Sequence, residues 1–220
     1  MKKYVFAVKS IDMKTIEDLS KTYLWLDTEF TSLEIDRADL LQVAIVATDS
    51  NLNRVFSSDK DLNIHIKLED DADLSPWVAE NLCGLVALCR SDAALPIDDV
   101  RIAVKCWLAD NFGEKRDDVS MRPIIAGNSL FCDLCLIRRC IPELADFANY
   151  RILDVSSWKV HLKNTNTIPA FEKDNGEAIQ ANLPWALAGN GSEHDAYFDV
   201  QASISELNYY MKELTHAGDK

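Results

Sequence analysis

The sequence has no apolar run that approaches the roughly 18 residues needed to span a bilayer, so we expect no membrane contact. It also lacks the marks of a secreted protein, because the apolar stretch near its start ends at Lys9 without a small-residue cleavage site. Its first twenty residues contain no arginine and carry Asp12, Glu17 and Asp18, which disfavours a mitochondrial transit peptide. We therefore expect a cytoplasmic protein, with a mitochondrial location as the alternative.

Positive charge is scarce. Lysine and arginine number 23 against 36 aspartates and glutamates, which gives a formal net charge of −13. A protein that grips long nucleic acid over a broad surface needs many basic residues against the phosphates, so the charge argues against that class. It leaves open a short nucleic-acid substrate in a small pocket, where metal cations would supply the positive charge.

A framework of paired cysteines is also missing. The six cysteines do not follow the spacing of a small secreted domain, and Cys132-x-x-Cys135 has no second pair at zinc-ligand spacing. We interpret this pair as small apolar residues on a helix, with a metal or redox role as the less favoured alternative. The thiols indicate a reducing compartment.

What is present is the composition of an ordinary globular domain, with 48% hydrophobic and 27% charged residues in 220. We interpret residues 1–22 as an N-terminal extension and residues 23–216 as one domain. Within it, residues 163–192 contain prolines and glycines but no firm periodicity, which is typical of a functional loop or an insertion.

Apolar patterning predicts an α/β fold: three strands, then helices, then two more strands separated by a helix. The strands are predicted from Tyr23 onward and at 40–49, 62–68, 122–128 and 151–157. Helical stripes are predicted over 78–89, 100–108, 134–141 and 200–214, and Pro142 should end the third.

Two acids interrupt the first strand. Asp27 and Glu29 are two residues apart, so their side chains should point to the same face of the sheet. Like charges on one half-buried face repel each other, and isolated buried ions are costly. A strand here therefore requires something positive between the two carboxylates.

Three further residues could complete such a site. Taken alone, Asp133 could be a helix-start residue, Asp199 a solvated helix residue and His194 an ordinary loop histidine. Together with Asp27 and Glu29 they fit two-metal phosphodiester hydrolysis, because magnesium and manganese prefer carboxylate oxygens and a near-neutral histidine can accept a proton from water.

Helix geometry constrains the histidine. Two residues five positions apart on a helix do not face one point, so we expect His194 before the last helix and Asp199 inside it. Ser192-x-x-Asp195 resembles an N-cap followed by an acid, which predicts a helix start around Glu193.

Several segments, in the order of a known family, span most of residues 23–210: "WLDTEFTSL", "LLQVAIVATDSNLN", "IIAGNSLFCD", "IPELADFANYRILDVSS" and "HDAYFDVQASISELNYY". On these segments the chain resembles the oligoribonucleases, which are 3′-to-5′ exoribonucleases of the DEDD type with a catalytic histidine. The resemblance implies an RNase H-like fold, with a mixed five-stranded sheet flanked by helices, and a homodimer.

The same resemblance implies a set of residue roles. Two divalent cations, Mg²⁺ or Mn²⁺, would be held by Asp27, Glu29, Asp133 and Asp199, with His194 as general base. The substrate would be short single-stranded RNA, from dinucleotides to pentanucleotides and dinucleotides above all, cleaved to 5′-mononucleotides. The residues matching the family's substrate contacts are Leu33 as a wedge, Tyr150 from the other subunit, and Ser129, Arg151, Ser156 and Ser157 as a cap over the 5′-phosphate.

The sequence departs from the family at Ser32, where the family has glycine, and at Asn81 and Leu82, where a family histidine has no counterpart. Two alternatives stay open. One is a related DEDD-type exonuclease that acts on single-stranded DNA or longer RNA ends. The other is an inactive binding scaffold of the same fold.

Overall fold

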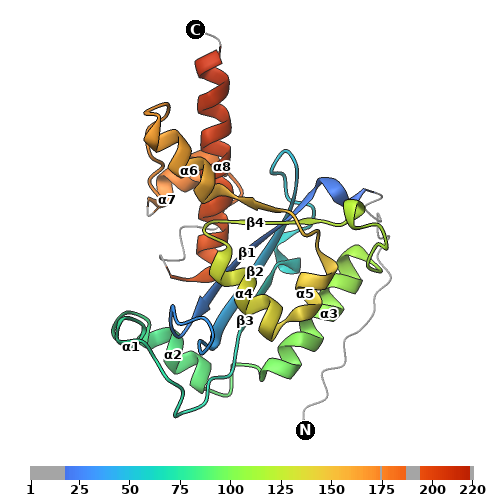
Figure 1. Ribbon diagram of the computed structural model, residues 1–220, viewed down its shortest axis with the longest axis vertical. Coiled ribbons are helices and arrows are strands. Elements are labelled where there is room, and N and C mark those ends of the chain that lie inside the picture. The colour runs from blue at the N-terminus through green and yellow to red at the C-terminus, as the bar shows by residue number, and fades with distance from the viewer. Residues whose placement is uncertain (1–17, 174, 187–193, 219–220) are drawn as a thin grey trace.

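A five-stranded mixed sheet forms the centre of the molecule in the computed structural model, which describes residues 18–173, 175–186 and 194–218 (Figure 1). The strands are β1 (Thr22–Phe30), β2 (Leu40–Asp49), β3 (Leu62–His65), β4 (Ile124–Gly127) and β5 (Ile152–Asp154). They lie in the order β3-β2-β1-β4-β5. The pairs β1–β2 and β2–β3 are antiparallel, whereas β1–β4 and β4–β5 are parallel. The predicted mixed five-stranded sheet flanked by helices is confirmed.

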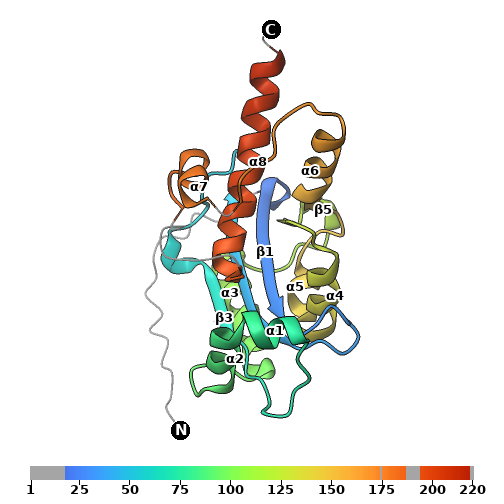
Figure 2. The ribbon, with the colours of Figure 1, turned by 90° about the vertical axis from the view of Figure 1, so that its left-hand side faces the viewer.

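Helices cover both faces of this sheet. They are α1 (Pro76–Asn81), α2 (Cys83–Arg90), α3 (Ile97–Phe112), α4 (Phe131–Cys140), α5 (Pro142–Phe147), α6 (Val155–Asn164), α7 (Gly176–Asn182) and α8 (Ala196–Gly218). Short 3₁₀ turns occur at Leu19–Lys21, Ser58–Lys60 and Val119–Met121. Figure 2 shows α7 and α8 on one side of β1, and α4 and α5 on the other.

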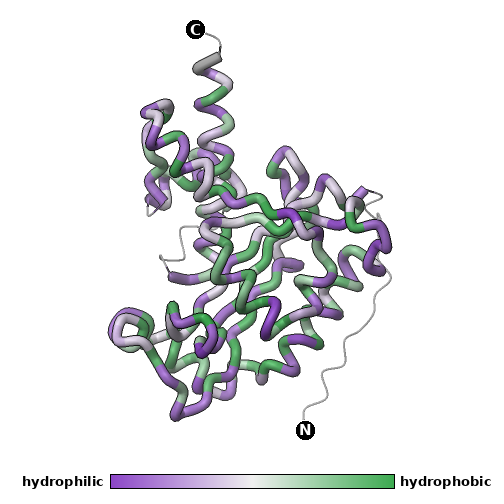
Figure 3. The backbone as a smooth tube through the Cα atoms, viewed as in Figure 1, coloured by the Kyte–Doolittle hydropathy of each residue, from purple (hydrophilic) through white to green (hydrophobic). Residues whose placement is uncertain are grey.

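The alternation of side chains along β1 divides the core into two clusters. Leu24 and Leu26 join the cluster formed with α3, α4 and α5, whereas Trp25 joins the cluster formed with α6, α7 and α8. All three are essentially inaccessible, and burying such a side chain contributes about 1.5–3 kcal/mol. The hydrophobic colouring of Figure 3 is accordingly concentrated in the central strands. Asp27 and Glu29 continue the row of Trp25 and therefore face α8.

Two predicted strand ends are wrong. β3 ends at His65 rather than at residue 68, because the β2–β3 register ends at that residue and Ile66 forms an isolated parallel bridge with Leu95. The strand predicted over 151–157 ends at Asp154, and α6 begins at Val155. The cause is a helix cap, since a carboxylate oxygen of Asp154 accepts a hydrogen bond from the backbone N–H of Ser156 at 2.9 Å.

The stretch predicted to be irregular over 163–192 contains a helix. Asn175 Oδ1 accepts hydrogen bonds from the backbone N–H groups of Glu177 and Ala178, and this cap starts α7. Ile179 of α7 is fully buried against α8. Residues 187–192 lie outside the described part of the chain, as do residues 1–17 of the predicted extension, so the domain limits stay a prediction. In the described residues, no helix is both long and apolar enough to span a bilayer.

Candidate active site

The five residues predicted to be catalytic line one cavity of about 570 Å³. The cavity lies beside the end of β1, the first turn of α4 and the start of α8. It collects residues that are far apart in the sequence: Asp27, Glu29, Asp133, His194 and Asp199. The predicted convergence is therefore observed, and the chemical role of each residue stays a prediction.

The two acids of β1 are electrostatically crowded. Burial raises the pKa of Asp27 well above its usual range, and the charges of Asp133, Asp199 and Glu29 raise it further. Burial likewise raises the pKa of Glu29 to about 8, with Asp199 and Asp133 as the next causes. In the absence of a cation, Glu29 therefore favours its neutral form near neutral pH. The repulsion expected from the sequence is thus present in the fold.

Asp133 is tied directly to β1. It lies in the first turn of α4, where one carboxylate oxygen accepts hydrogen bonds from the backbone N–H of Thr28 at 2.9 Å and from its hydroxyl at 2.6 Å. Burial raises the pKa of Asp133 to about 6, while the hydrogen bonds from Thr28 act in the opposite direction. The residue between the two strand acids therefore fixes the third acid beside them.

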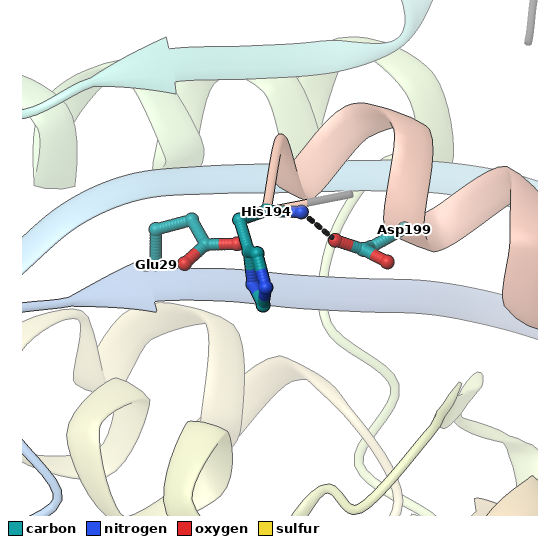
Figure 4. A group of neighbouring side chains, drawn as sticks. All are labelled: Glu29, His194 and Asp199. Carbon is teal, nitrogen blue, oxygen red and sulfur yellow. Dashed lines mark hydrogen bonds between the residues drawn. The ribbon is translucent and has the colours of Figure 1, made fainter. Parts of the chain in front are cut away.

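His194 lies in the turn before α8, and Asp199 lies within that helix, as predicted. The backbone N–H of His194 donates to Asp199 Oδ2 at 2.9 Å (Figure 4). His194 has a positive φ of 68°, a backbone conformation that is uncommon for residues other than glycine. Its exposed ring makes an edge contact with Trp77 of α1, with centroids 4.8 Å apart.

The predicted start of this last helix is wrong by three residues. α8 begins at Ala196 rather than around Glu193. A carboxylate oxygen of Asp195 accepts hydrogen bonds from the backbone N–H groups of Tyr197 and Phe198, at 2.9 and 3.3 Å. Asp195 therefore has the capping role that the sequence pattern assigned to Ser192, which lies outside the described residues.

The donor set of the cavity suits a divalent cation. One ligand atom each from Glu29, His194 and Asp199 lie within 4.8 Å of one another, and Figure 4 shows the imidazole beside the two carboxylates. Carboxylate oxygens are the preferred ligands of magnesium, and both carboxylate and imidazole suit manganese or zinc. Asp27 and Asp133 add two buried carboxylates to the same cavity. The residues present therefore fit a metal centre.

Sequence reasoning missed one charged residue of the site. Lys173, from the segment between α6 and α7, places its ammonium nitrogen 2.5 Å from Asp199 Oδ1 and lines the cavity. It lies in the stretch without periodicity, where no pattern indicates the direction of a side chain. Its only signal was a basic residue in a long irregular segment of an acidic protein.

The predicted substrate contacts divide into two groups. Leu33, which is 80% exposed, and Ser129 line the cavity, and the hydroxyl groups of Ser129 and Ser156 lie 2.9 Å apart. Arg151 and Ser157 are exposed beyond the described lining of the cavity, and Arg151 lies over the ring of Tyr150.

Tyr150 lines a second cavity of about 260 Å³ and is 70% exposed. Cys132 and Cys135 are free, half-buried thiols on α4, and Cys132 also lines the cavity of the acids, so their interpretation as helix packing residues stays a prediction.

Comparison with known proteins places this site in a family. A model of the exonuclease family (RNase_T) matches residues 24–207. The probable oligoribonuclease of Schizosaccharomyces pombe is 28% identical over 200 residues, which cover 89% of this chain and 69% of that protein. The oligoribonuclease of Photorhabdus laumondii is 31% identical over 191 residues, which cover 86% of this chain and 93% of that protein.

The fold is also similar to that of solved exonucleases. The structure of E. coli exonuclease I in complex with a 5cy-dA13 oligonucleotide superimposes with a TM-score of 0.59 at 17% identity. The match covers 90% of this chain but only 42% of exonuclease I, so this likeness concerns the fold alone.

The chain therefore belongs to the exonuclease family and, within it, to the oligoribonucleases. Its fold is RNase H-like, as the resemblance implied. The protein is an enzyme, a 3′-to-5′ exoribonuclease that hydrolyses phosphodiester bonds.

Proposed function

We propose that the protein hydrolyses short oligoribonucleotides, dinucleotides above all, to 5′-mononucleotides. The observation that carries the proposal is the convergence of four acids and a histidine in one cavity, in a chain that aligns with oligoribonucleases over most of its length. A net charge of −13 also disfavours long polyanions, which need many basic contacts.

Two divalent cations, Mg²⁺ or Mn²⁺, would be held by Asp27, Glu29, Asp133 and Asp199. Such a pair supplies activation of the attacking water and stabilisation of the leaving oxygen. What supports this assignment is the electrostatics of the cavity, because burial and mutual repulsion disfavour the ionised acids unless positive charge is bound among them.

His194 would act as the general base that accepts a proton from the attacking water. Its ring is exposed, and its backbone is held to Asp199, so the imidazole can reach a water molecule without leaving the site. The variant His194→Ala should therefore lose activity while retaining Mn²⁺ affinity. Loss of Mn²⁺ binding in this variant would show that the histidine is a metal ligand instead.

Preference for short substrates would come from contacts at the end of the substrate remote from the cut. Ser129 and Ser156 approach each other beside the cavity, and Leu33 projects from its rim. Arg151 is the guanidinium that could pair with a terminal phosphate. In a homodimer, the exposed Tyr150 would reach the site of the other subunit.

The test compares rates of hydrolysis of a labelled dinucleotide with those of RNA and DNA strands of about twenty nucleotides, for which basic contacts should matter more. The dinucleotide should be cleaved fastest, and Asp27→Ala should abolish the reaction. Equal rates on both lengths of RNA would overturn the short-substrate proposal, and preference for the DNA strand would favour a DNA exonuclease. Wild-type activity no higher than that of Asp27→Ala would favour an inactive scaffold.

A further inference from the structure

Lys173 places a positive charge inside the acid site. Its ammonium nitrogen lies 2.5 Å from Asp199 Oδ1, and three quarters of its side chain is buried, with 25% exposed. The acceptor is almost completely buried, at 4% exposed. This ion pair is therefore part of the cavity rather than of the solvated surface.

The segment that carries Lys173 is anchored on both sides. Before it, Phe171 is buried and packs against the ring of Tyr209 on α8, with centroids 5.5 Å apart, and the Tyr209 hydroxyl donates to the carbonyl of Pro169. After it, Asn175 caps α7, whose Ile179 is fully buried. The fold thus holds the backbone of Lys173 near Asp199, and the long side chain supplies the remaining reach.

One ammonium group cannot balance the site. The charge of Lys173 lowers the pKa values of Asp27 and Glu29, yet burial and the neighbouring carboxylates outweigh it and both pKa values stay raised. A divalent ion carries twice the charge and can contact several carboxylates at once. The acid cluster should therefore favour the divalent ion over the lysine.

The two cations also exclude each other. An oxygen that lies 2.5 Å from an ammonium group leaves little room for a metal ion at coordination distance. Binding of a metal ion at Asp199 therefore requires Lys173 to withdraw.

We propose that Lys173 is a built-in counter-cation of the active site, which competes with divalent metal for Asp199 and so sets the metal affinity of the enzyme. The proposal rests on the metal dependence stated above. It makes the segment between α6 and α7 a determinant of the metal concentration at which the enzyme becomes active.

The test is a calorimetric titration of Mn²⁺ into metal-free wild-type protein and into Lys173→Met, which keeps much of the side chain's length but removes the charge. Lys173→Met should bind Mn²⁺ about tenfold more tightly, which corresponds to about 1.4 kcal/mol. Lys173→Arg, which keeps the charge, should stay close to the wild type. If Lys173→Met does not fold, as judged by circular dichroism, Lys173→Gln takes its place.

Lys159→Met is the matched control. Lys159 also pairs with a buried acid, at 3.6 Å from Glu206 Oε1, and is 39% exposed, but it is not among the described residues that line the cavity. This variant should leave Mn²⁺ affinity unchanged.

Unchanged or weakened Mn²⁺ affinity in Lys173→Met would overturn the proposal, and so would an equal gain in Lys159→Met. The titration does not depend on nuclease activity. Tighter Mn²⁺ binding by Lys173→Met in a protein that cleaves no RNA would refute the proposed function and support the counter-cation. If neither wild type nor variant bound Mn²⁺, both proposals would fail.

Discussion

At single residues of the site, burial changes the free energy of ionising a carboxyl group. Asp27 on a solvated strand would be an ordinary ionised aspartate, but in this fold it is buried among three other carboxylates. Its ionised form then costs free energy, because both desolvation and like charges oppose it. The arrangement destabilises the metal-free protein and creates affinity for a cation.

Replacing Asp27 by asparagine should separate these two effects. We expect Asp27→Asn to bind Mn²⁺ poorly, yet to be no less stable than wild type in chelator, because relief of the repulsion offsets any hydrogen bonds lost. Thermal melts in chelator and Mn²⁺ titrations measure the two properties. The exposed Asp92 provides the control, since Asp92→Asn should alter neither. A large loss of stability of Asp27→Asn in chelator would contradict the proposed electrostatic repulsion between Asp27 and the neighbouring carboxylates.

The pH dependence of stability follows from the same groups. The pKa values of Glu29 and Asp133 are raised to about 8 and about 6, whereas unfolded carboxyl groups titrate near about 4. The folded state therefore binds these protons more tightly. The resulting stability is fully present below about pH 4 and is lost as the pH rises through about 8.

In chelator, the melting temperature should thus fall between about pH 5 and about pH 8, and Glu29→Gln should flatten the fall. Surface acids whose pKa is lowered, such as Asp146 beside Lys115, change the stability only at lower pH and therefore do not contribute to this fall. Saturating Mn²⁺ should also flatten the curve. A melting temperature in chelator that rises across this range would contradict the raised pKa values.

Among the secondary-structure elements, the junction between β4 and α4 packs closely against β1 beside the site. A Cβ atom on Gly127 would lie 2.5 Å from the backbone carbonyl oxygen of Leu26 and 2.8 Å from the side chain of Leu130. Two residues later, Ser129 adopts a positive φ of 51°. This turn brings Asn128 and Ser129 to the cavity, where Asn128 is also held by a hydrogen bond to buried Glu206 of α8.

Gly127→Ala should therefore destabilise the protein by about 1–3 kcal/mol, as expected when a methyl group is forced into a packed interior. Urea denaturation measures the change. Gly84→Ala is the matched control, because a Cβ atom there meets no atom within 4 Å and alanine favours α2 by about 0.5–1 kcal/mol. Equal stability of the two variants would show that the junction can relax.

The elements also show what the sequence could and could not predict. Continuous apolar runs identified β1 and β2, and the spacing of apolar residues identified α8, because burial on a sheet or helix face imposes those periods. The ends of elements were less predictable, since they depend on single side-chain caps such as Asp154 and Asp195.

At the site, Asp27 and Glu29 could be identified because charge interrupts an apolar strand. Lys173 could not, because its position depends on tertiary anchors at Phe171 and α7 rather than on a local pattern. Periodicity did not link the strand acids to Asp133, His194 and Asp199; the chemistry of two-metal hydrolysis did, and the family resemblance then implied the same set.

The whole molecule is strongly acidic, and its candidate site is more acidic still. A protein with a net charge of −13 has little to attract a polyanion except the cations that it binds. The two helical layers on the sheet bury the structural core, and the acids gather at one end of β1, between α4 and α8. Metal binding is thus expected to create the positive potential that a short RNA requires.

Metal should also stabilise the fold as a whole, because an ion that binds only the folded state raises the free energy of unfolding. We expect Mn²⁺ at about one hundred times its dissociation constant to add about 2.7 kcal/mol, measured by urea denaturation with and without chelator. The variant Asp199→Asn should reduce this gain. Equal stability of the wild type with and without Mn²⁺ would contradict a metal site.

The most direct measurement is anomalous diffraction from crystals grown with Mn²⁺ and a dinucleotide, recorded at the manganese absorption edge. Two anomalous peaks should appear in the cavity, about 3.5–4 Å apart, ligated by Asp27, Glu29, Asp133 and Asp199. A cavity that contains dinucleotide but no anomalous peak would contradict the conclusion that these four acids form a metal centre.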